Sequence, residues 1–207
     1  YTAFPRQFGD ACEVEFSTPE DPALKKMDEE GWTVIPRGGT FRSLIKKLDV
    51  ILGEERFRIL QLLPIHPVPT TFARMGRFGS PFAGTDFLGV DPALAEFDKS
   101  ATPLDQFHEL VDAVHTRGAR IFMDLPANHT GWASTLQIHH PDWFVRAADG
   151  KFVSPGAWGV IWEDLVALDY SKPRLRDFMA KVFEFWCRQG VNGFRCDAGY
   201  MVPAEVW

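Results

Sequence analysis

The sequence predicts an α/β fold with parallel strands, because short β-type runs alternate with longer helix-type runs along the chain. Its 207 residues are 45% hydrophobic and 24% charged, which is typical of a globular domain. Polar side chains gather where the expected strands end, as in α/β enzymes. Two architectures are consistent with this order of strands and helices, a doubly wound sheet and a (β/α)8 barrel. The positions of the polar residues decide between them.

The first strand is expected at Tyr1–Phe4, and residues 5–40 are predicted to be irregular because proline and glycine recur there. Thr40 can cap a helix over Phe41–Leu52, whose apolar residues recur with a period near 3.6. The apolar run Ile59–Leu63 is typical of a parallel strand that is covered on both faces.

A loop rich in glycine, proline and phenylalanine is expected over residues 66–100. Thr102 and Pro103 then begin a second helix, which we expect to end at Gly118. The third strand is predicted at Arg120–Asp124, because three apolar residues lie between its charged ends.

A long, loop-rich connection is expected over residues 125–165. Ser171–Pro173 has the pattern of a helix N-terminus with proline in the first turn, and this helix should run to Gln189. Gly190 ends it, and Val191–Asp197 leads into the fourth strand.

Charged residues follow the third and fourth strands, at the same edge of the predicted sheet. Side chains alternate across a strand, so Arg195 and Asp197 share one face. Asp124 ends the neighbouring strand, where a carboxylate–guanidinium pair would fix Arg195. Arg195 would then help to keep Asp197 ionised. On spacing alone, a structural lock and a catalytic arrangement are about equally good interpretations.

Four segments resemble motifs of one enzyme family, the alpha-amylase family of glycoside hydrolases (family 13). Asp124–His129 (DLPANH) resembles its first signature region, and Gly193–Ala198 (GFRCDA) resembles its second. Ser80–Asp86 (SPFAGTD) is similar to the segment that carries an aromatic ring against the sugar, and Leu165–Pro173 (LVALDYSKP) resembles the approach to the third helix. The four lie in the family's order and span nearly the whole chain.

The resemblance implies a partial (β/α)8 barrel, about its first four βα units, with a short loop-rich domain B after the third strand. Residues 1–130 would form the first half of the barrel, 131–165 the domain B-like loop, and 166–207 the third helix and fourth strand. The family's general acid, a Glu after strand five, and its third carboxylate, after strand seven, would lie beyond Trp207. We therefore expect an N-terminal fragment of a longer enzyme, inactive on its own.

The same resemblance implies roles for individual residues. Asp197 would be the nucleophile that forms a covalent glycosyl-enzyme, Arg195 would hold and polarise it, and Asp124 would brace Arg195. His129 would hydrogen-bond the sugar in the cleavage subsite, and Phe82 would stack on that sugar.

Other positions have weaker expectations. Asp86 would shape the pocket, and Asn128 matches a position that often binds a structural calcium ion, the one cofactor implied. His66 and Glu205 are expected to be structural rather than catalytic. Tyr200 and Met201 stand where classical alpha-amylases commonly have Lys and His, which weakens a prediction of plain starch endo-hydrolysis.

The predicted function is that of a retaining alpha-glycoside hydrolase or alpha-glucan transferase acting on alpha-glucans or maltooligosaccharides. The alternative is a non-catalytic carbohydrate-binding or scaffold relative of the same family. An unrelated α/β enzyme such as a nucleotide binder ranks last, because no glycine-rich phosphate loop follows a strand.

The resemblance implies an oligosaccharide or polysaccharide substrate and the C-terminal remainder of the same enzyme as partners, and composition argues against others. The net charge is −6 with no basic block, which argues against nucleic acid and an anionic membrane. No run approaches the roughly 18 apolar residues of a membrane span. The scattered Cys12, Cys187 and Cys196 indicate no disulfide framework and favour a cytoplasmic protein, although a cleaved export signal would leave the same sequence.

Overall fold

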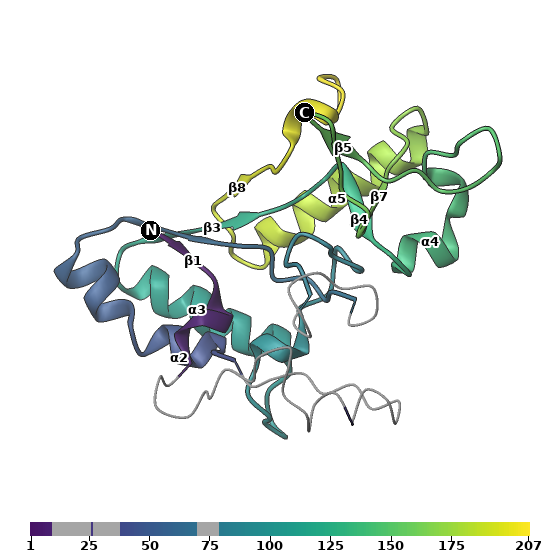
Figure 1. Ribbon diagram of the computed structural model, residues 1–207. Helices are drawn as coiled ribbons and strands as arrows, with labels where there is room; N and C mark the ends of the chain where they lie inside the picture. Colours follow the sequence, from purple (N-terminus) through teal and green to yellow (C-terminus); the bar gives the residue numbers. More distant parts are fainter. Residues whose placement is uncertain (10–25, 27–37, 70–78) are drawn as a thin grey trace.

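The computed structural model describes residues 1–9, 26, 38–69 and 79–207, so Cys12 and much of the irregular stretch over residues 5–40 lie outside it. Its centre is a parallel sheet with the strand order β1-β2-β3-β8 (Figure 1). The strands are β1 (Thr2–Ala3), β2 (Ile59–Leu62), β3 (Arg120–Asp124) and β8 (Gly193–Arg195). All four lie within the strands that the sequence predicts, but three are shorter.

The register of the sheet places the carboxyl ends of β3 and β8 side by side. Asp124 pairs with Arg195 across the two strands, and the Leu125 amide donates to the Arg195 carbonyl oxygen at 2.8 Å. Gly193 opens β8 directly against the ring of Phe122, where a Cβ would lie 2.7 Å from the ring carbon Cζ. Glycine is therefore needed for this close approach of the two strands.

Helices α3 (Pro103–Thr116) and α5 (Pro173–Arg188) begin where the sequence predicts. Thr102 and Asp105 form a reciprocal capping box at the start of α3. At α5 the N-cap residue is Lys172, which makes no side-chain cap, so proline alone marks that start.

The single helix expected over Phe41–Leu52 is wrong. The structure has a short α2 (Phe41–Ile45), a turn, and a π-helical segment η2 (Asp49–Glu54). The predicted apolar face is nevertheless buried, including Leu44 and Leu48. The reason is that apolar spacing indicates which face is buried but not which carbonyl each amide uses; in η2 the amide of Glu55 bonds the carbonyl oxygen of Val50 at 2.8 Å.

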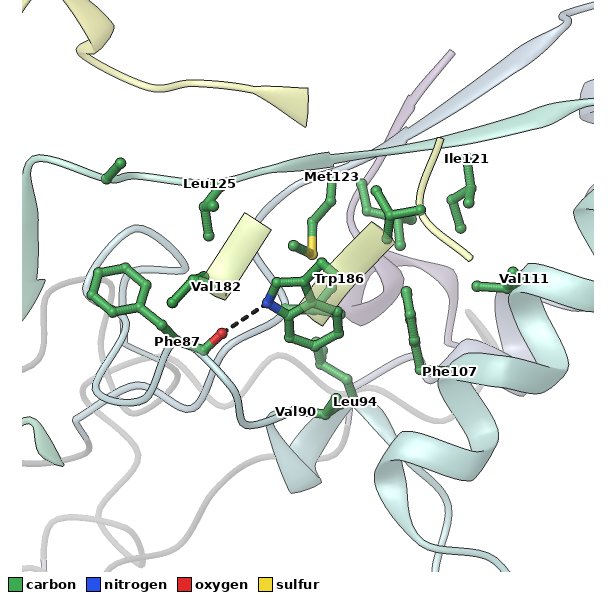
Figure 2. Close-up of a cluster of buried hydrophobic side chains, with 14 of the residues drawn as sticks. Phe87, Val90, Leu94, Phe107, Val111, Ile121, Met123, Leu125, Val182 and Trp186 are labelled. Carbon is green, nitrogen blue, oxygen red and sulfur yellow. Dashed lines mark hydrogen bonds between the residues drawn. The ribbon is translucent and has the colours of Figure 1, made fainter. Parts of the chain in front are cut away.

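Trp186 of α5 joins the sheet, the helices and the loop after β2 into one core (Figure 2). Its side chain is fully buried, and its ring meets that of Phe107 on α3 edge to face at 5.6 Å. The indole Nε1 donates to the carbonyl oxygen of Phe87 at 2.8 Å, which pins the loop to α5. Because the indole has its partner, this large ring lies in the core without an unsatisfied polar atom.

The connection after β3 has more regular structure than its loop-rich sequence indicates. Strands β4 (His129–Gly131) and β7 (Leu165–Ala167) pair antiparallel, and β5 (Gly156–Ala157) and β6 (Val160–Ile161) form a hairpin. The remaining short elements are α4 (Thr135–His139) and the 3-10 turns η1 (Pro5–Phe8), η4 (Pro92–Leu94), η5 (Pro141–Trp143) and η6 (Gly199–Met201). The β4–β7 pair brackets residues 131–165; their separation as a domain stays a prediction.

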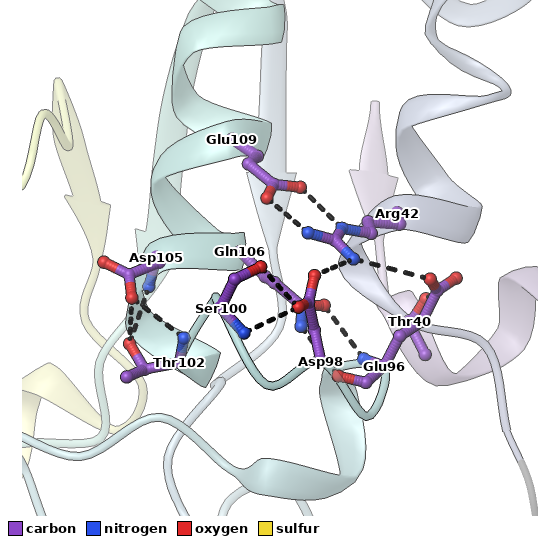
Figure 3. Close-up of polar contacts among 9 residues, drawn as sticks. All are labelled: Thr40, Arg42, Glu96, Asp98, Ser100, Thr102, Asp105, Gln106 and Glu109. Carbon is purple, nitrogen blue, oxygen red and sulfur yellow. Dashed lines mark hydrogen bonds and ion pairs between the residues drawn. The ribbon is translucent and has the colours of Figure 1, made fainter.

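A surface network ties α2 to α3 (Figure 3). Arg42 donates through Nε and Nη2 to the carboxylate of Glu109 at 2.7 and 2.6 Å, and through Nη1 to Asp98 at 2.9 Å. Glu96 completes this network, because its Oε2 lies 3.8 Å from Nη1 of Arg42.

Within the described ranges, no helix combines the length and the apolar character that crossing a bilayer requires.

Candidate functional site

The candidate site lies at the carboxyl ends of β3 and β8, where one guanidinium lies between two carboxylates. Arg195 Nη1 forms an ion pair with Asp124 Oδ2, and Arg195 Nη2 lies 2.8 Å from Asp197 Oδ1. The sequence predicted this convergence from the alternation of side chains on β8 and the position of Asp124 on the next strand. The parallel β3–β8 register produces it, because it sets Asp124 opposite Arg195.

The two carboxylates differ in environment. The Asp124 side chain is 0% exposed, whereas the side chain of Arg195 is 46% exposed and that of Asp197 is 25% exposed. Burial raises the pKa of Asp124 to about 6, although the hydrogen bond from Arg195 acts in the opposite direction. Asp124 thus holds the guanidinium from within the protein, and Asp197 holds it from the partly exposed side.

His129 and Phe82 also come together, but through the backbone of Phe82. The Phe82 carbonyl oxygen can only accept, so it fixes the proton on His129 Nε2 at 3.0 Å. The imidazole is buried, which lowers its pKa, and its Nδ1 has no partner among the described residues. Burial thus disfavours the charged form of His129, and its Nε2 is already engaged. Its sugar contact, and that of the half-buried Phe82 ring, stay predictions.

Asp86 lies in a turn of its own. Its Oδ1 accepts from the Leu88 amide at 2.9 Å, and no contact seen in the described part of the chain joins it to Arg195 or Asp197. The carboxylate stabilises a turn in the loop that carries Phe82, and its role in shaping the pocket stays a prediction.

Asn128 is buried beside the end of the chain. Its Nδ2 donates to the sulfur of Met201 at 3.1 Å, while its Oδ1 has no hydrogen-bond partner among the described residues. That oxygen is available as a ligand for a hard cation such as calcium. In the described ranges, however, no three His, Cys, Asp or Glu side chains gather to form a metal site.

Two contacts near the site were not predicted from the sequence. The hydroxyl of Tyr170 donates to the Ala127 carbonyl oxygen at 2.5 Å and so ties the DLPANH segment to the approach of α5. Met201 meets Asn128, as described above. Tyr170 belongs to the LVALDYSKP motif, which was a usable signal; nothing in the sequence pairs Met201 with Asn128.

The two residues expected to be structural, Glu205 and His66, each have a partner of their own. Glu205 forms an ion pair with Arg176, at 3.4 Å between Oε1 and Nη1. His66 is buried and donates through Nδ1 to the Gly89 carbonyl oxygen at 3.1 Å, and burial lowers its pKa to about 4. Its Nε2 has no hydrogen-bond partner within the part of the chain that the structure describes.

Comparison with known proteins gives consistent matches. The family described as "Alpha amylase, catalytic domain" matches residues 4–206. An alpha-amylase 3 from Dictyoglomus thermophilum is 24% identical over 78% of this chain and 33% of its own length. An alpha-1,4-glucan:maltose-1-phosphate maltosyltransferase from Myxococcus xanthus is 29% identical over 73% of this chain and 24% of its own. The chain thus spans about a quarter to a third of these relatives.

A solved structure agrees with the sequence matches. The crystal structure of an alpha-amylase from Lactobacillus plantarum has a TM-score of 0.76 and 29% identity, covering all of this chain and 40% of that one. Such neighbours imply that the four-stranded parallel sheet is part of a (β/α)8 barrel. Because the family model covers nearly every residue, the chain belongs to the alpha-amylase family.

Proposed function

We propose that this chain is the N-terminal part of a retaining alpha-glycoside hydrolase or alpha-glucan transferase, with Asp197 as its nucleophile. One observation carries the proposal: Asp124 and Asp197 share the guanidinium of Arg195, and only Asp197 is on the open side. The names of the relatives, an alpha-amylase and an alpha-1,4-glucan maltosyltransferase, favour an alpha-glucan or maltooligosaccharide as substrate.

The proposed chemistry follows from the charges. Cleavage of a glycosidic bond passes through an oxocarbenium-like state, which a carboxylate can stabilise and then trap as a covalent glycosyl-enzyme. Arg195 orients Asp197 through the 2.8 Å ion pair, and the buried Asp124 prevents the guanidinium from turning away. In this mechanism Asp197 contacts the sugar, and the other two residues position it.

A retaining enzyme also needs a general acid about 5–5.5 Å from the nucleophile. The carboxylate that meets Asp197 through Arg195 is Asp124, which is buried, and Glu205 is paired with Arg176 instead. We therefore propose that the general acid lies in another part of the longer protein. We also propose that the present chain comprises about four βα units and has no turnover on its own. A cytoplasmic location belongs to the same proposal.

Calcium is proposed on a narrower basis, the unpaired and buried Oδ1 of Asn128. Calcium takes six to eight oxygen ligands, so one side-chain oxygen needs backbone carbonyls or water to complete a site. No step of the proposed reaction passes through the ion. If it binds, adding calcium to chelator-treated protein should raise the thermal midpoint, and Asn128→Ala should abolish that rise.

The decisive experiment is incubation of the full-length protein with maltooligosaccharides, followed by analysis of the products. Asp197→Asn should lower turnover at least about 10³-fold, because a covalent nucleophile cannot be replaced by an amide. Asp98→Asn is the matched control, since it also removes one carboxylate from an arginine, and it should change turnover less than about twofold.

Two results would contradict the proposal. A folded wild-type protein that binds oligosaccharide without turning it over would favour the non-catalytic carbohydrate-binding alternative. Turnover that survives Asp197→Asn would remove Asp197 from the nucleophile's role.

A further inference from the structure

A hollow rich in arginine lies at the amino-terminal edge of the sheet. Its volume is about 400 Å³, and it is lined by Asp49, Leu52, Gly53, Arg56, Arg58 and Arg117. Arg58 immediately precedes β2, and Arg117 lies between α3 and β3. Because the strands are parallel, their amino ends share one edge of the sheet, whereas Asp124 and Asp197 lie at the other edge. The hollow is therefore separate from the candidate site.

Backbone contacts bring the arginines of the hollow together. The Arg120 amide, at the start of β3, donates to the Arg58 carbonyl oxygen at 2.9 Å. This bond sets Arg58 beside the turn after α3, where Arg117 is the C-cap residue. The Phe57 amide donates to the Ile51 carbonyl oxygen at 3.2 Å, which folds the segment before β2 back against η2. Side chains from segments far apart in sequence thus face one space.

The lining of the hollow is positively charged. Three guanidinium groups against the one carboxylate of Asp49 leave a charge of +2, in a chain whose net charge is −6. Arg117 donates through Nε to Asp49 Oδ1 at 2.8 Å, which lowers the pKa of Asp49. Its Nη1 donates to the Ala113 carbonyl oxygen at 2.9 Å, as basic residues commonly do at the end of a helix. Arg117 therefore has a structural role that explains its presence.

Arg56 and Arg58 have no comparable role. Among the residues that the structure describes, neither guanidinium has a hydrogen bond or an ion pair. Arg56 has φ of 58°, a left-handed conformation that is uncommon for a residue other than glycine. It follows directly on the π-helical η2, and both strained residues and π-helical turns cluster at functional sites. A Cβ at Gly53 would meet no heavy atom within 4 Å, so the wall of the hollow is open there.

The geometry and the charge select one class of ligand. A guanidinium presents two parallel N–H groups that match the oxygens of a phosphate group. A phosphate monoester carries a charge of about −1.5 to −2 at neutral pH on three acceptor oxygens, so it balances the charge of the hollow. A single carboxylate would balance only half of it. The volume lies within the roughly 300–1,000 Å³ usual for small-ligand sites, which leaves room for the group that carries the phosphate.

We propose that this hollow binds a dianionic phosphoryl group, with Arg56 and Arg58 as its ligands and the Asp49–Arg117 pair as its fixed wall. Free phosphate and a small phosphorylated metabolite share this chemistry. The inference goes beyond the proposed function and does not depend on it, because no residue of the hollow belongs to the candidate site.

The test measures binding to the full-length protein by calorimetry at about pH 8, where phosphate is mostly dianionic. The two probes are inorganic phosphate and glycerol 3-phosphate, a monoester without a sugar ring that could occupy a glucan site. Arg58→Gln should raise the Kd of both about fivefold, because a charge-assisted hydrogen bond is lost. Arg56→Asn should do the same, and asparagine tolerates the left-handed turn. The double variant should raise the Kd at least about 20-fold.

Arg174→Gln is the matched control, because Arg174 is an exposed arginine of α5 outside the hollow. It should leave both Kd values unchanged. A Kd for glycerol 3-phosphate at least about tenfold below that for phosphate would support the site with a phosphorylated metabolite as its ligand. Equal Kd values would support it with the phosphoryl group alone as the recognised part.

Three results would overturn the phosphoryl site. Equal weakening by Arg58→Gln and Arg174→Gln would mean that only overall charge attracts the anion. Absence of binding of either probe to the folded protein would remove the site. A lower thermal midpoint of Arg58→Gln with an unchanged Kd would mean that the arginine holds another part of the protein instead. Turnover of maltooligosaccharides is measured separately, so each proposal can fail without the other.

Discussion

Two arginines in this protein each gather carboxylates, and their surroundings differ. Arg42 bridges α2 and α3 at the surface, with Glu109, Asp98 and Glu96 around it (Figure 3). Arg195 lies at the end of β8 between Asp124 and Asp197. Hydrogen bonds from Ser100, with help from Arg42, lower the pKa of Asp98 to about 2, whereas burial raises that of Asp124 to about 6.

The comparison teaches that an arginine partner does not by itself decide the state of a carboxylate. At the surface the cost of removing water is small, so hydrogen bonds and the cation stabilise the charged form. In the interior the same attraction is outweighed by the lost hydration of Asp124. The Arg42 network thus stabilises the contact between two helices, while the Arg195 cluster combines a buried brace with an accessible carboxylate.

The largest expected difference is in turnover. Arg195→Gln in the full-length protein should lower turnover on maltooligosaccharides at least about 100-fold, because Asp197 loses the group that orients it. Arg42→Gln should change turnover less than about twofold, since it affects only the α2–α3 contact. Steady-state rates of the two variants measure this directly, and equal losses would mean that the Arg195 cluster is only a structural lock.

A smaller effect is expected in the pH dependence of stability, with opposite signs at the two carboxylates. The pKa of Asp124 is raised from 3.8 to about 6, so its contribution is present below about pH 4 and lost as the pH rises through 6. Wild-type protein should therefore lose roughly 2 kcal/mol relative to Asp124→Asn between pH 4 and pH 7, at about 1.4 kcal/mol per unit of pKa.

Asp98 supplies the control for this pH prediction. Its pKa is lowered to about 2, so its contribution is present above about pH 4 and lost as the pH falls toward 2. Urea unfolding across this range should show wild-type protein gaining stability over Asp98→Asn as the pH rises from 2 to 4. Slopes of the same sign for both variants would show that burial does not dominate at Asp124.

The smallest expected effect is the response to salt. At 1 M salt the screening length is about 3 Å, so exposed ion pairs weaken more than buried ones. The stability difference between wild type and Arg42→Gln should shrink as salt rises, whereas that between wild type and Asp124→Asn should change less, because the Asp124 carboxylate is fully buried. Urea unfolding at low and high salt measures both differences, and equal salt sensitivity would place the two clusters in similar surroundings.

Local signals account for much of what could be predicted about the fold. Thr102, Pro103 and Asp105 define the start of α3 within one turn, and the apolar residues of Arg120–Asp124 indicate β3. The interruption between α2 and η2 could not be predicted, because the same apolar spacing suits either hydrogen-bond pattern. The pairing of β4 with β7 joins short segments about 35 residues apart in the chain, which no periodicity indicates.

The sequence by itself determined the family, the four strands of the central sheet and the three charged residues of the candidate site, because these depend on short motifs, on apolar runs and on the alternation of side chains along β8. Only the tertiary structure decided that Asp124 is buried while Asp197 is accessible, and that Arg58 and Arg117 line one hollow. The physical reason is that burial and side-chain clusters arise from segments remote in sequence, which meet only when the sheet and its connections pack together.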